Sequence, residues 1–190
     1  MLNSLFGILI FCISLCSFFA RAEAPLKNYT LQDQNGKSFQ LTDLKGSYLF
    51  VSFIYTRCPL PKMCPLTMSL NRRLFTAWKK SASTVPLKFL IVTLDPNQDS
   101  PSVLKRYGKK FNLNEAYFTL ATGPDQVLSD FSAEFNAIGL PSNGLMAHNS
   151  KSVLLGPLLT PLKDYKENEW APEEVIKDLL SFHANKEKKT

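Results

Sequence analysis

The stretch YLFVSFIYTRCPLPKMCP at residues 48–65 joins an almost wholly apolar run to two cysteines that are separated by five residues. The apolar run at 48–54 predicts a strand covered on both faces, because a strand with one wet face would alternate apolar and polar residues. After the cysteines, apolar side chains recur at every fourth position, at Leu66, Leu70, Leu74 and Trp78. This spacing predicts an amphipathic helix from about Pro65 to Lys80. The cysteine loop is therefore expected between the end of a buried strand and the start of a helix.

Strands and helices are expected to alternate through the rest of the chain. A second apolar run at 87–94 precedes a helix start at Ser100 and Pro101, and this order predicts a βαβ unit with parallel strands. The other expected elements are a hairpin within 26–44, a strand at 116–120, a helix around 127–138, a strand or hairpin edge at 152–160 and a last helix around 175–180. Together they predict one α/β domain.

The amino-terminal segment is predicted to direct export. An unbroken apolar run at 5–20 leads into Ala20-Arg21-Ala22, a small-x-small pattern typical of signal-peptide cleavage. Residues 1–22 are thus expected to be a signal peptide, or an N-terminal anchor that tethers the protein to a membrane through residues 5–20. Residues 23–190 would form the exported domain. Cys12 and Cys16 fall in the leader, so the opening pair, Cys58 and Cys64, is the whole thiol content of that domain.

Positive charge is concentrated around the cysteines. No Asp or Glu occurs from Leu44 to Leu94, whereas Lys and Arg recur there, at Lys45, Arg57, Lys62, Arg72, Arg73, Lys79, Lys80 and Lys88. This segment is either a solvated basic helix face or a docking surface for an acidic partner protein or an anionic membrane. Nucleic acid is not expected as a partner, because the chain is predicted to be exported and carries no recognised binding motif.

The cysteine pair has three possible uses: a structural disulfide, a redox couple or a metal site. A disulfide closing seven residues would stabilise the fold by only roughly 2 to 2.5 kcal/mol, and Pro59, Pro61 and Pro65 already stiffen that segment. A helix N-terminus, with Arg57 and Lys62 nearby, is expected to favour thiolates, which suit both disulfide exchange and metal binding.

Ligand counting narrows the choice of metal. Besides the two cysteines, the exported part offers His148, in a predicted loop, and His183, which is expected to be solvated among lysines before the polar tail. A structural zinc site would need four Cys or His ligands. Two thiolates and one imidazole suit Cu(I), or Cu(II) with an added oxygen ligand, because soft thiolates select copper. His148 is the candidate third ligand.

Three strings in order, FIYTRCPLPKMCP (53–65), TLDPNQDSPSVLKRYGKKF (93–111) and AHNSKSVLL (147–155), resemble the Sco/SenC family of thioredoxin-like copper proteins. The resemblance extends from about Leu26 to the final helix. In most of that family three residues separate the cysteines, so this chain resembles a variant with a longer loop. The resemblance implies a thioredoxin-like fold with a central mixed β-sheet flanked by helices.

The resemblance also implies a function and a site. It implies a copper metallochaperone that helps to assemble the dinuclear copper centre of cytochrome c oxidase, with Cys58, Cys64 and His148 as ligands and Asp95 in a supporting role. Its expected partner is an oxidase subunit with an acidic docking face. The alternative is a thiol-disulfide oxidoreductase in which Cys58 and Cys64 are catalytic, served by a thiol reductant protein. Either protein would work in the periplasm, on the outer face of the inner membrane, or in the intermembrane space if mitochondrial.

Overall fold

Strand β3 (Tyr48–Ile54) lies inside a seven-stranded sheet with the order β2-β1-β5-β4-β3-β8-β9. The computed structural model describes residues 24–137, 139–142 and 145–188, so the predicted leader lies outside the described residues. The other strands of this sheet are β1 (Thr30–Asp33), β2 (Ser38–Gln40), β4 (Leu87–Thr93), β5 (Phe118–Thr122), β8 (Lys151–Leu155) and β9 (Pro161–Lys166). A separate antiparallel pair is formed by β6 (Gly139–Ser142) and β7 (Leu145–His148).

The sheet is mixed, as predicted. Strand β4 pairs in parallel with β3 and with β5, whereas β8 is antiparallel to β3 and to β9. The helices are α1 (Cys64–Lys80), α2 (Pro101–Lys110), α3 (Asp125–Ala133) and α4 (Pro172–Glu187), with a short 3-10 turn η1 (Leu41–Leu44). Within the described ranges, no helix has the length and apolar character needed to cross a bilayer.

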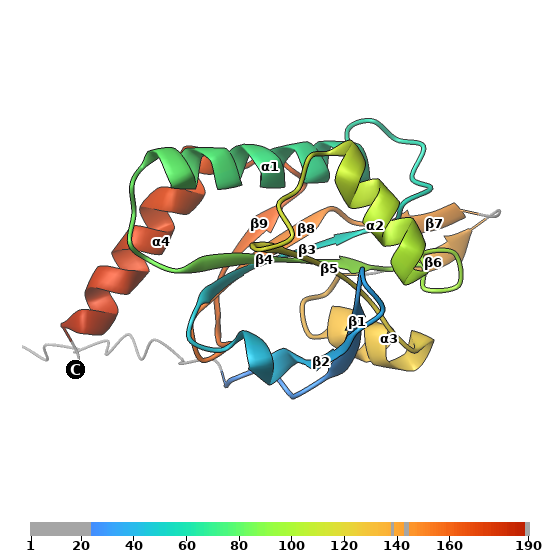
Figure 1. The fold of residues 1–190 in the computed structure, drawn as a ribbon, viewed down its shortest axis with the longest axis horizontal. Helices are drawn as coiled ribbons and strands as arrows, with labels where there is room; N and C mark the ends of the chain where they lie inside the picture. The colour runs from blue at the N-terminus through green and yellow to red at the C-terminus, as the bar shows by residue number, and fades with distance from the viewer. Residues whose placement is uncertain (1–23, 138, 143–144, 189–190) are drawn as a thin grey trace, which may run out of the picture.

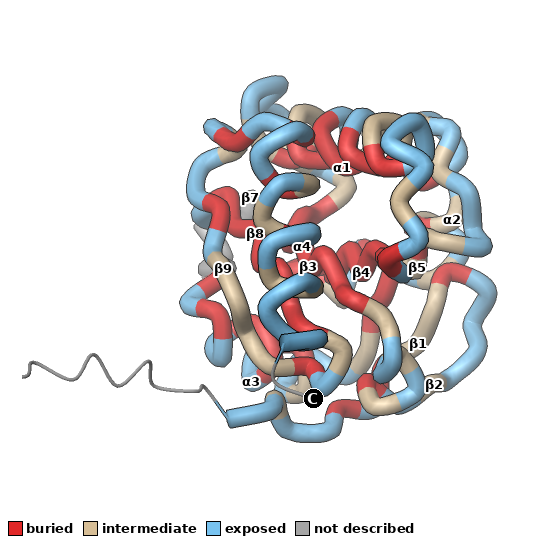
Figure 2. The backbone as a smooth tube through the Cα atoms, turned by 90° about the vertical axis from the view of Figure 1, so that its left-hand side faces the viewer, coloured by how far each residue is buried: buried red, intermediate tan, exposed pale blue. Residues whose placement is uncertain are grey.

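Helices cover both faces of the sheet and bury two apolar cores. Figure 1 shows α1 and α4 over one face and α3 under the other. Successive side chains of β3 enter opposite cores: Phe50 packs in the core under α1 and α4, and Val51 in the core over α3. All seven β3 residues are buried, and Figure 2 shows buried backbone along β3 and β4 beneath helices with exposed outer sides. The β3 side chains therefore fill both cores of the domain.

Most of the sequence-based boundaries are confirmed. Strand β3 has the predicted bounds, α1 begins one residue earlier than predicted, and the βαβ unit with parallel strands is present. The predicted strand at 116–120 begins only at Phe118, because the backbone N–H groups of Tyr117 and Phe118 bond to the Asn114 carbonyl in a turn. The expected edge at 152–160 contains most of β8 and a turn at 156–160, which joins β8 to β9 beyond the predicted range.

The prediction that His148 lies in a loop was wrong. His148 is the last residue of β7, and its backbone pairs with Gly139 of β6. The described side chains do not include those of residues 138–148, so the backbone alone fixes the place of His148. The polar tail predicted after residue 182 is also mostly helical, because α4 continues to Glu187.

Candidate functional site

The cysteine loop, residues 55–63, leaves the end of β3 and enters α1 at Cys64. Two backbone turns shape it, one in which the Cys58 N–H donates to the Tyr55 carbonyl and one in which the Met63 N–H donates to Leu60. Pro65 sits in the first turn of α1, where a missing N–H costs no helix bond. The loop thus begins and ends in defined turns and exposes the stretch 59–62 between them.

The two sulfurs lie close together but in different surroundings. Cys64 is fully buried in the core under α1, and its Sγ accepts a hydrogen bond from the Tyr55 N–H at 3.3 Å. Cys58 is half-buried, and it is near enough to contribute a hydrogen bond and a charge interaction at the Cys64 thiol. The structure therefore presents a dithiol with one sheltered sulfur and one that reaches the surface.

The expectation of thiolates at neutral pH is wrong for Cys64. Burial raises the pKa of the Cys64 thiol well above its ordinary value; the hydrogen bond from the Tyr55 N–H lowers the pKa by less than burial raises it, and the neighbouring Cys58 raises it further. Arg57, which was expected to stabilise a thiolate, turns its guanidinium to Asp95 at 3.0 Å. Cys64 is therefore a protonated thiol at neutral pH, and binding a metal would have to displace its proton.

Two carboxylates from the loop after β4 hold the start of the cysteine loop. Asp95 forms an ion pair with Arg57, the residue directly before Cys58 in the chain, so this predicted supporting residue contacts the cysteine loop. Asp99, which is fully buried, accepts hydrogen bonds from the Thr56 N–H at 3.0 Å and from the Thr56 hydroxyl. The Thr93 hydroxyl, at the end of β4, donates to the same carboxylate at 2.6 Å. Asp99 thus ties the carboxyl ends of two parallel strands together.

Asp99 lies within the motif at 93–111, but the sequence alone indicates no role for it. A polar residue two positions from a helix-starting proline suggests only a cap, and its partner Thr56 lies 43 residues away. Tyr107 was also missed: it packs against the core that holds Cys64, and burial together with the nearby cysteines raises its pKa. No local pattern could have singled it out from the apolar face of α2.

Sheet register brings the start of β8, the strand that follows His148, to the end of the sheet where the cysteine loop begins. Because β8 is antiparallel to β3, the start of β8 lies beside the end of β3. Ser52 and Ser152 face each other in this ladder, and their hydroxyls are 2.8 Å apart in the interior. His148 precedes β8 by only three residues. Among the described side chains, which exclude that of His148, no three His, Cys, Asp or Glu groups are placed to hold a metal.

His183 is not simply solvated, contrary to the sequence-based expectation. Its ring lies edge-on to Tyr48 with centroids 5.9 Å apart, and its Nε2 is 3.5 Å from a Glu187 carboxylate oxygen. Its Nδ1 is buried without a hydrogen-bond partner among the described residues. His183 belongs to α4 and contacts the starting residue of β3, whereas the cysteines follow the other end of that strand.

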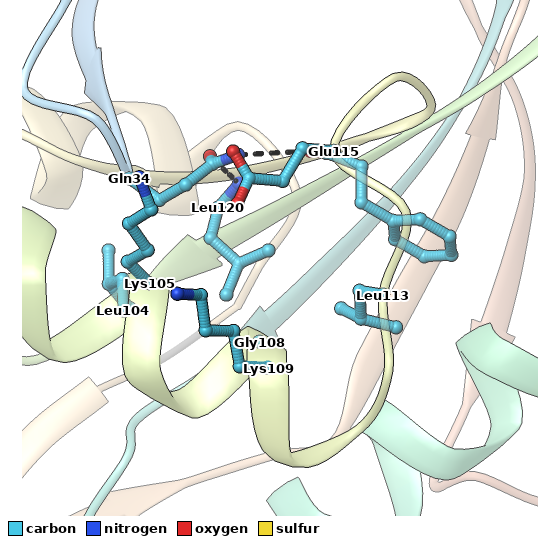
Figure 3. A pocket seen from close by; sticks show the side chains of 9 residues that line it. Gln34, Leu104, Lys105, Gly108, Lys109, Leu113, Glu115 and Leu120 are labelled. Carbon is cyan, nitrogen blue, oxygen red and sulfur yellow. Dashed lines mark hydrogen bonds between the residues drawn. The ribbon is translucent and has the colours of Figure 1, made fainter.

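A small pocket between α2 and β5 lies apart from the cysteines. Its lining includes Gln34, Leu104, Gly108 and Leu120 (Figure 3). The Gln34 side chain accepts a bond from the Leu120 N–H at 2.9 Å and donates to the Phe118 carbonyl at 3.3 Å. It extends the short β1–β5 ladder past its last backbone pair, Asp33 with Ala121. The Gln34 amide in this pocket is therefore used to hold the sheet together.

A mixed sheet whose central parallel strand leads through a two-cysteine loop into a helix defines a thioredoxin-like α/β domain with a dithiol site. The family model described as SCO1/SenC matches residues 20–184. The chain belongs to the SCO1/SenC family.

Individual relatives agree with this assignment. The SCO1 protein homolog of Bacillus subtilis (strain 168) is 29% identical over 160 residues, which cover 80% of each protein. A Stutzerimonas stutzeri protein, named provisionally as copper-binding, is 31% identical over 143 residues, or 71% of this chain and 66% of that protein. The solved structure of BsSco, described as having a disulfide switch and as a member of the Sco family of cytochrome c oxidase assembly proteins, matches with a TM-score of 0.72. It is 27% identical and covers 84% of this chain and 93% of its own.

Replacing Asp99 tests how the loop is anchored. Asp99→Ala should lower the free energy of unfolding by about 1 to 3 kcal/mol, because three hydrogen-bond donors, two of the half-buried Thr56 and one of the buried Thr93, lose their acceptor. Asp99→Asn should cost less, since the amide keeps one acceptor oxygen and buries no charge. Denaturant unfolding at neutral pH measures both, and equal losses in the two variants would contradict the hydrogen-bond account.

A comparison of the wild type with Asp99→Asn at different pH values tests the protonation of Asp99. Burial raises the pKa of Asp99 above its ordinary value of 3.8, so the folded state binds this proton more tightly than the unfolded state does. The stability of the native protein relative to Asp99→Asn should therefore rise as the pH falls from the raised pKa toward 3.8. A difference that is flat or falls over that range would show that Asp99 is not the buried acid described above.

Proposed function

We propose that this protein binds one copper ion through Cys58, Cys64 and His148 and carries it to a copper site under assembly, that of cytochrome c oxidase. The observation that carries the proposal is the closeness of the two sulfurs at the end of the sheet where β8, which starts three residues after His148, also begins. The donor set fits copper, since two soft thiolates with one imidazole select it over harder divalent ions. The relative named as copper-binding and the assembly role ascribed to the Sco family support it.

The residues around the sulfurs fit a metal that is bound and later released. Cys64 is held from below by the Tyr55 N–H, and Cys58 lies at the surface side of the pair. A partner's ligand would reach Cys58 before Cys64. Because Cys64 is protonated without metal, copper uptake at this sulfur is coupled to proton release. Copper is the cargo of the protein in this proposal, and the chain supplies the ligands and their placement.

Histidine variants test the three-ligand site. His148→Ala should weaken Cu(I) binding of the reduced domain by at least about tenfold, since one of three ligands is lost. Competition with a coloured Cu(I) chelator measures the affinity, and thermal unfolding checks that the fold is retained. The matched control is His183→Ala, which removes the other histidine of the chain and should leave the copper affinity unchanged. Equal affinity of the wild type and His148→Ala would eliminate His148 as a ligand.

A thiol-disulfide exchange function is the second candidate, favoured by the contact between the two thiols and by the disulfide switch described for BsSco. In that reaction Cys58 and Cys64 would form a disulfide, giving two electrons and two protons to a partner disulfide that becomes a dithiol. A reduced domain that takes up no copper but reduces a test disulfide would establish this function in place of the first. Copper should otherwise protect both thiols from alkylation.

The exposed part of the cysteine loop provides a docking surface in this proposal. We call residues 59–62 the loop tip; all four are exposed, and 53% of the Leu60 surface is open to solvent. Lys62 gives the tip a positive charge, and the segment from 44 to 94 carries no acidic residue. An apolar side chain beside a cation fits a partner surface with an apolar contact inside an acidic rim. The five-residue spacing between the cysteines creates this tip.

Reversing the charge of the tip tests the docking surface. Lys62→Glu should slow copper transfer to the soluble copper-site domain of the organism's own oxidase subunit by about threefold to tenfold at low salt, with less effect as salt rises. Stopped-flow absorbance can follow the transfer. Lys80→Glu is the matched control, because Lys80 lies at the other end of α1, about 25 Å away at 1.5 Å per residue. Equal slowing by both variants would show a general charge effect instead of docking at the tip.

We further propose that residues 1–22 direct export and that residues 23–190 act outside the cytoplasm, at the membrane that holds the oxidase. The apolar run at 5–20 supports this role, either as a cleaved signal peptide or as a retained anchor.

A further inference from the structure

Asn168 lies in the loop between β9 and α4, a part of the chain that no motif singled out. Asn168 and its neighbour Glu167 both have left-handed backbone conformations, with φ of 56° and 53°. Asn tolerates this conformation better than most residues with a side chain. The two left-handed residues turn the chain sharply after β9, and the half-buried Asn168 side chain then makes polar contacts with two distant segments.

The first contact is with the end of the cysteine loop. The Asn168 amide nitrogen is 3.3 Å from the Lys62 carbonyl and 3.2 Å from the Met63 carbonyl, the two groups directly before Cys64. The Thr67 hydroxyl, one turn into α1, lies 3.0 Å from the Asn168 amide oxygen and 3.2 Å from the Met63 carbonyl. Asn168 therefore bonds to the entry of α1 through both ends of its amide.

The second contact is with the segment that follows His148. The same amide nitrogen lies 3.3 Å from the Ser150 hydroxyl, and Ser150 is two residues after His148. The Glu167 N–H adds a backbone bond to the Ser150 carbonyl at 2.9 Å. One side chain thus shares its two amide hydrogens among acceptors from the cysteine loop and from the connection between β7 and β8.

A buried chain of polar groups continues from these contacts into the sheet. The Asn71 amide donates to the Thr67 carbonyl at 2.9 Å and to the Ser52 hydroxyl at 3.0 Å, and the Ser52 hydroxyl meets that of Ser152. These residues lie on α1, β3 and β8, the elements that flank the cysteines and follow His148. A continuous series of hydrogen bonds therefore links the start of α1, through Asn71 and Ser52, to Ser152 of β8.

We propose that Asn168 is a positioning residue that couples the cysteine loop to the His148 strand, so that the sulfurs and the histidine are held together as one metal site. The expected effect of Asn168 on copper affinity rests on the function proposed above. Loss of the Asn168 amide would release both segments from a shared donor while leaving each in its own turn or strand. Residues that orient metal ligands in this way commonly affect metal affinity by about tenfold to a hundredfold.

Glycine at position 168 is the cleanest test. Asn168→Gly removes the amide but keeps the left-handed backbone without strain, whereas Ala would add strain of its own. The expected result is a tenfold to hundredfold weaker Cu(I) affinity with near-native thermal unfolding. Glu167→Gly is the matched control, because Glu167 also has a left-handed backbone and its side chain is exposed. This variant keeps the backbone N–H bond to the Ser150 carbonyl. An unchanged affinity in Asn168→Gly, or an equal loss in Glu167→Gly, would overturn the proposal.

A metal-free measurement separates this inference from the proposed function. In the copper-free protein, Asn168→Gly should speed amide hydrogen exchange at residues 58–64 and at 148–152 together, and Glu167→Gly should not. Faster exchange in only one of these segments would refute the coupling. If both segments respond but the wild-type protein binds no copper, the coupling stands and the copper function fails.

A second variant covers the case in which Asn168→Gly does not fold. Asn168→Asp keeps the size of the side chain and its tolerance of the left-handed backbone, but it has no hydrogens to donate when ionised. It should show the same paired increase in hydrogen exchange and the same range of affinity loss. A double variant with His148→Ala adds a cycle: the affinity lost through Asn168→Gly should be smaller in that background, since the strand it holds no longer carries a ligand. Equal losses in both backgrounds would contradict coupling through His148.

Discussion

Strand β3 forms hydrogen-bonded ladders along both edges and packs side chains on both faces. A one-residue shift in such a strand would turn every side chain to the opposite core, so its register is strongly fixed. Two consequences meet at its carboxyl end. The cysteine loop leaves from a fixed point, and the antiparallel ladder brings the start of β8, with His148 just before it, to the same edge. The two parts of the candidate site thus depend on one buried strand.

The cysteine loop is held at both ends by polar groups. Ordering the loop costs conformational entropy, and the prolines lower that cost only in part. Hydrogen bonds to the buried Asp99 carboxylate hold the start of the loop, and the Arg57–Asp95 ion pair, whose Arg57 side chain is half exposed, adds a smaller contribution. Thr67 and Asn168 bond to its end. Apart from Arg57, the exposed residues of the loop are those of the loop tip at 59–62.

The parts that sequence could predict are those in which local pattern and tertiary packing agree. Strand β3 and helix α1 were found because apolar spacing reports burial directly. The late start of β5 was missed, since turn bonds to Asn114 overrode two residues of apolar sequence. The β7 strand was missed because it forms by pairing with β6, and no pattern in the residues around His148 predicts that pairing. The pKa of Cys64 was misjudged for a related reason: burial and the pairing of Arg57 with Asp95 are both tertiary facts.

The unequal burial of the two sulfurs bears on how such a site would work. Burial raises the pKa of Cys64, so both oxidation by the thiolate route and metal binding at this sulfur require the loss of its proton. Cys58, at the surface side of the pair, is the sulfur that a partner can approach. Exchange would then proceed from the exposed sulfur inward. A bound metal would leave the buried sulfur last. The contacts of Tyr55 and Asn168 near that sulfur would then decide how tightly the metal is held.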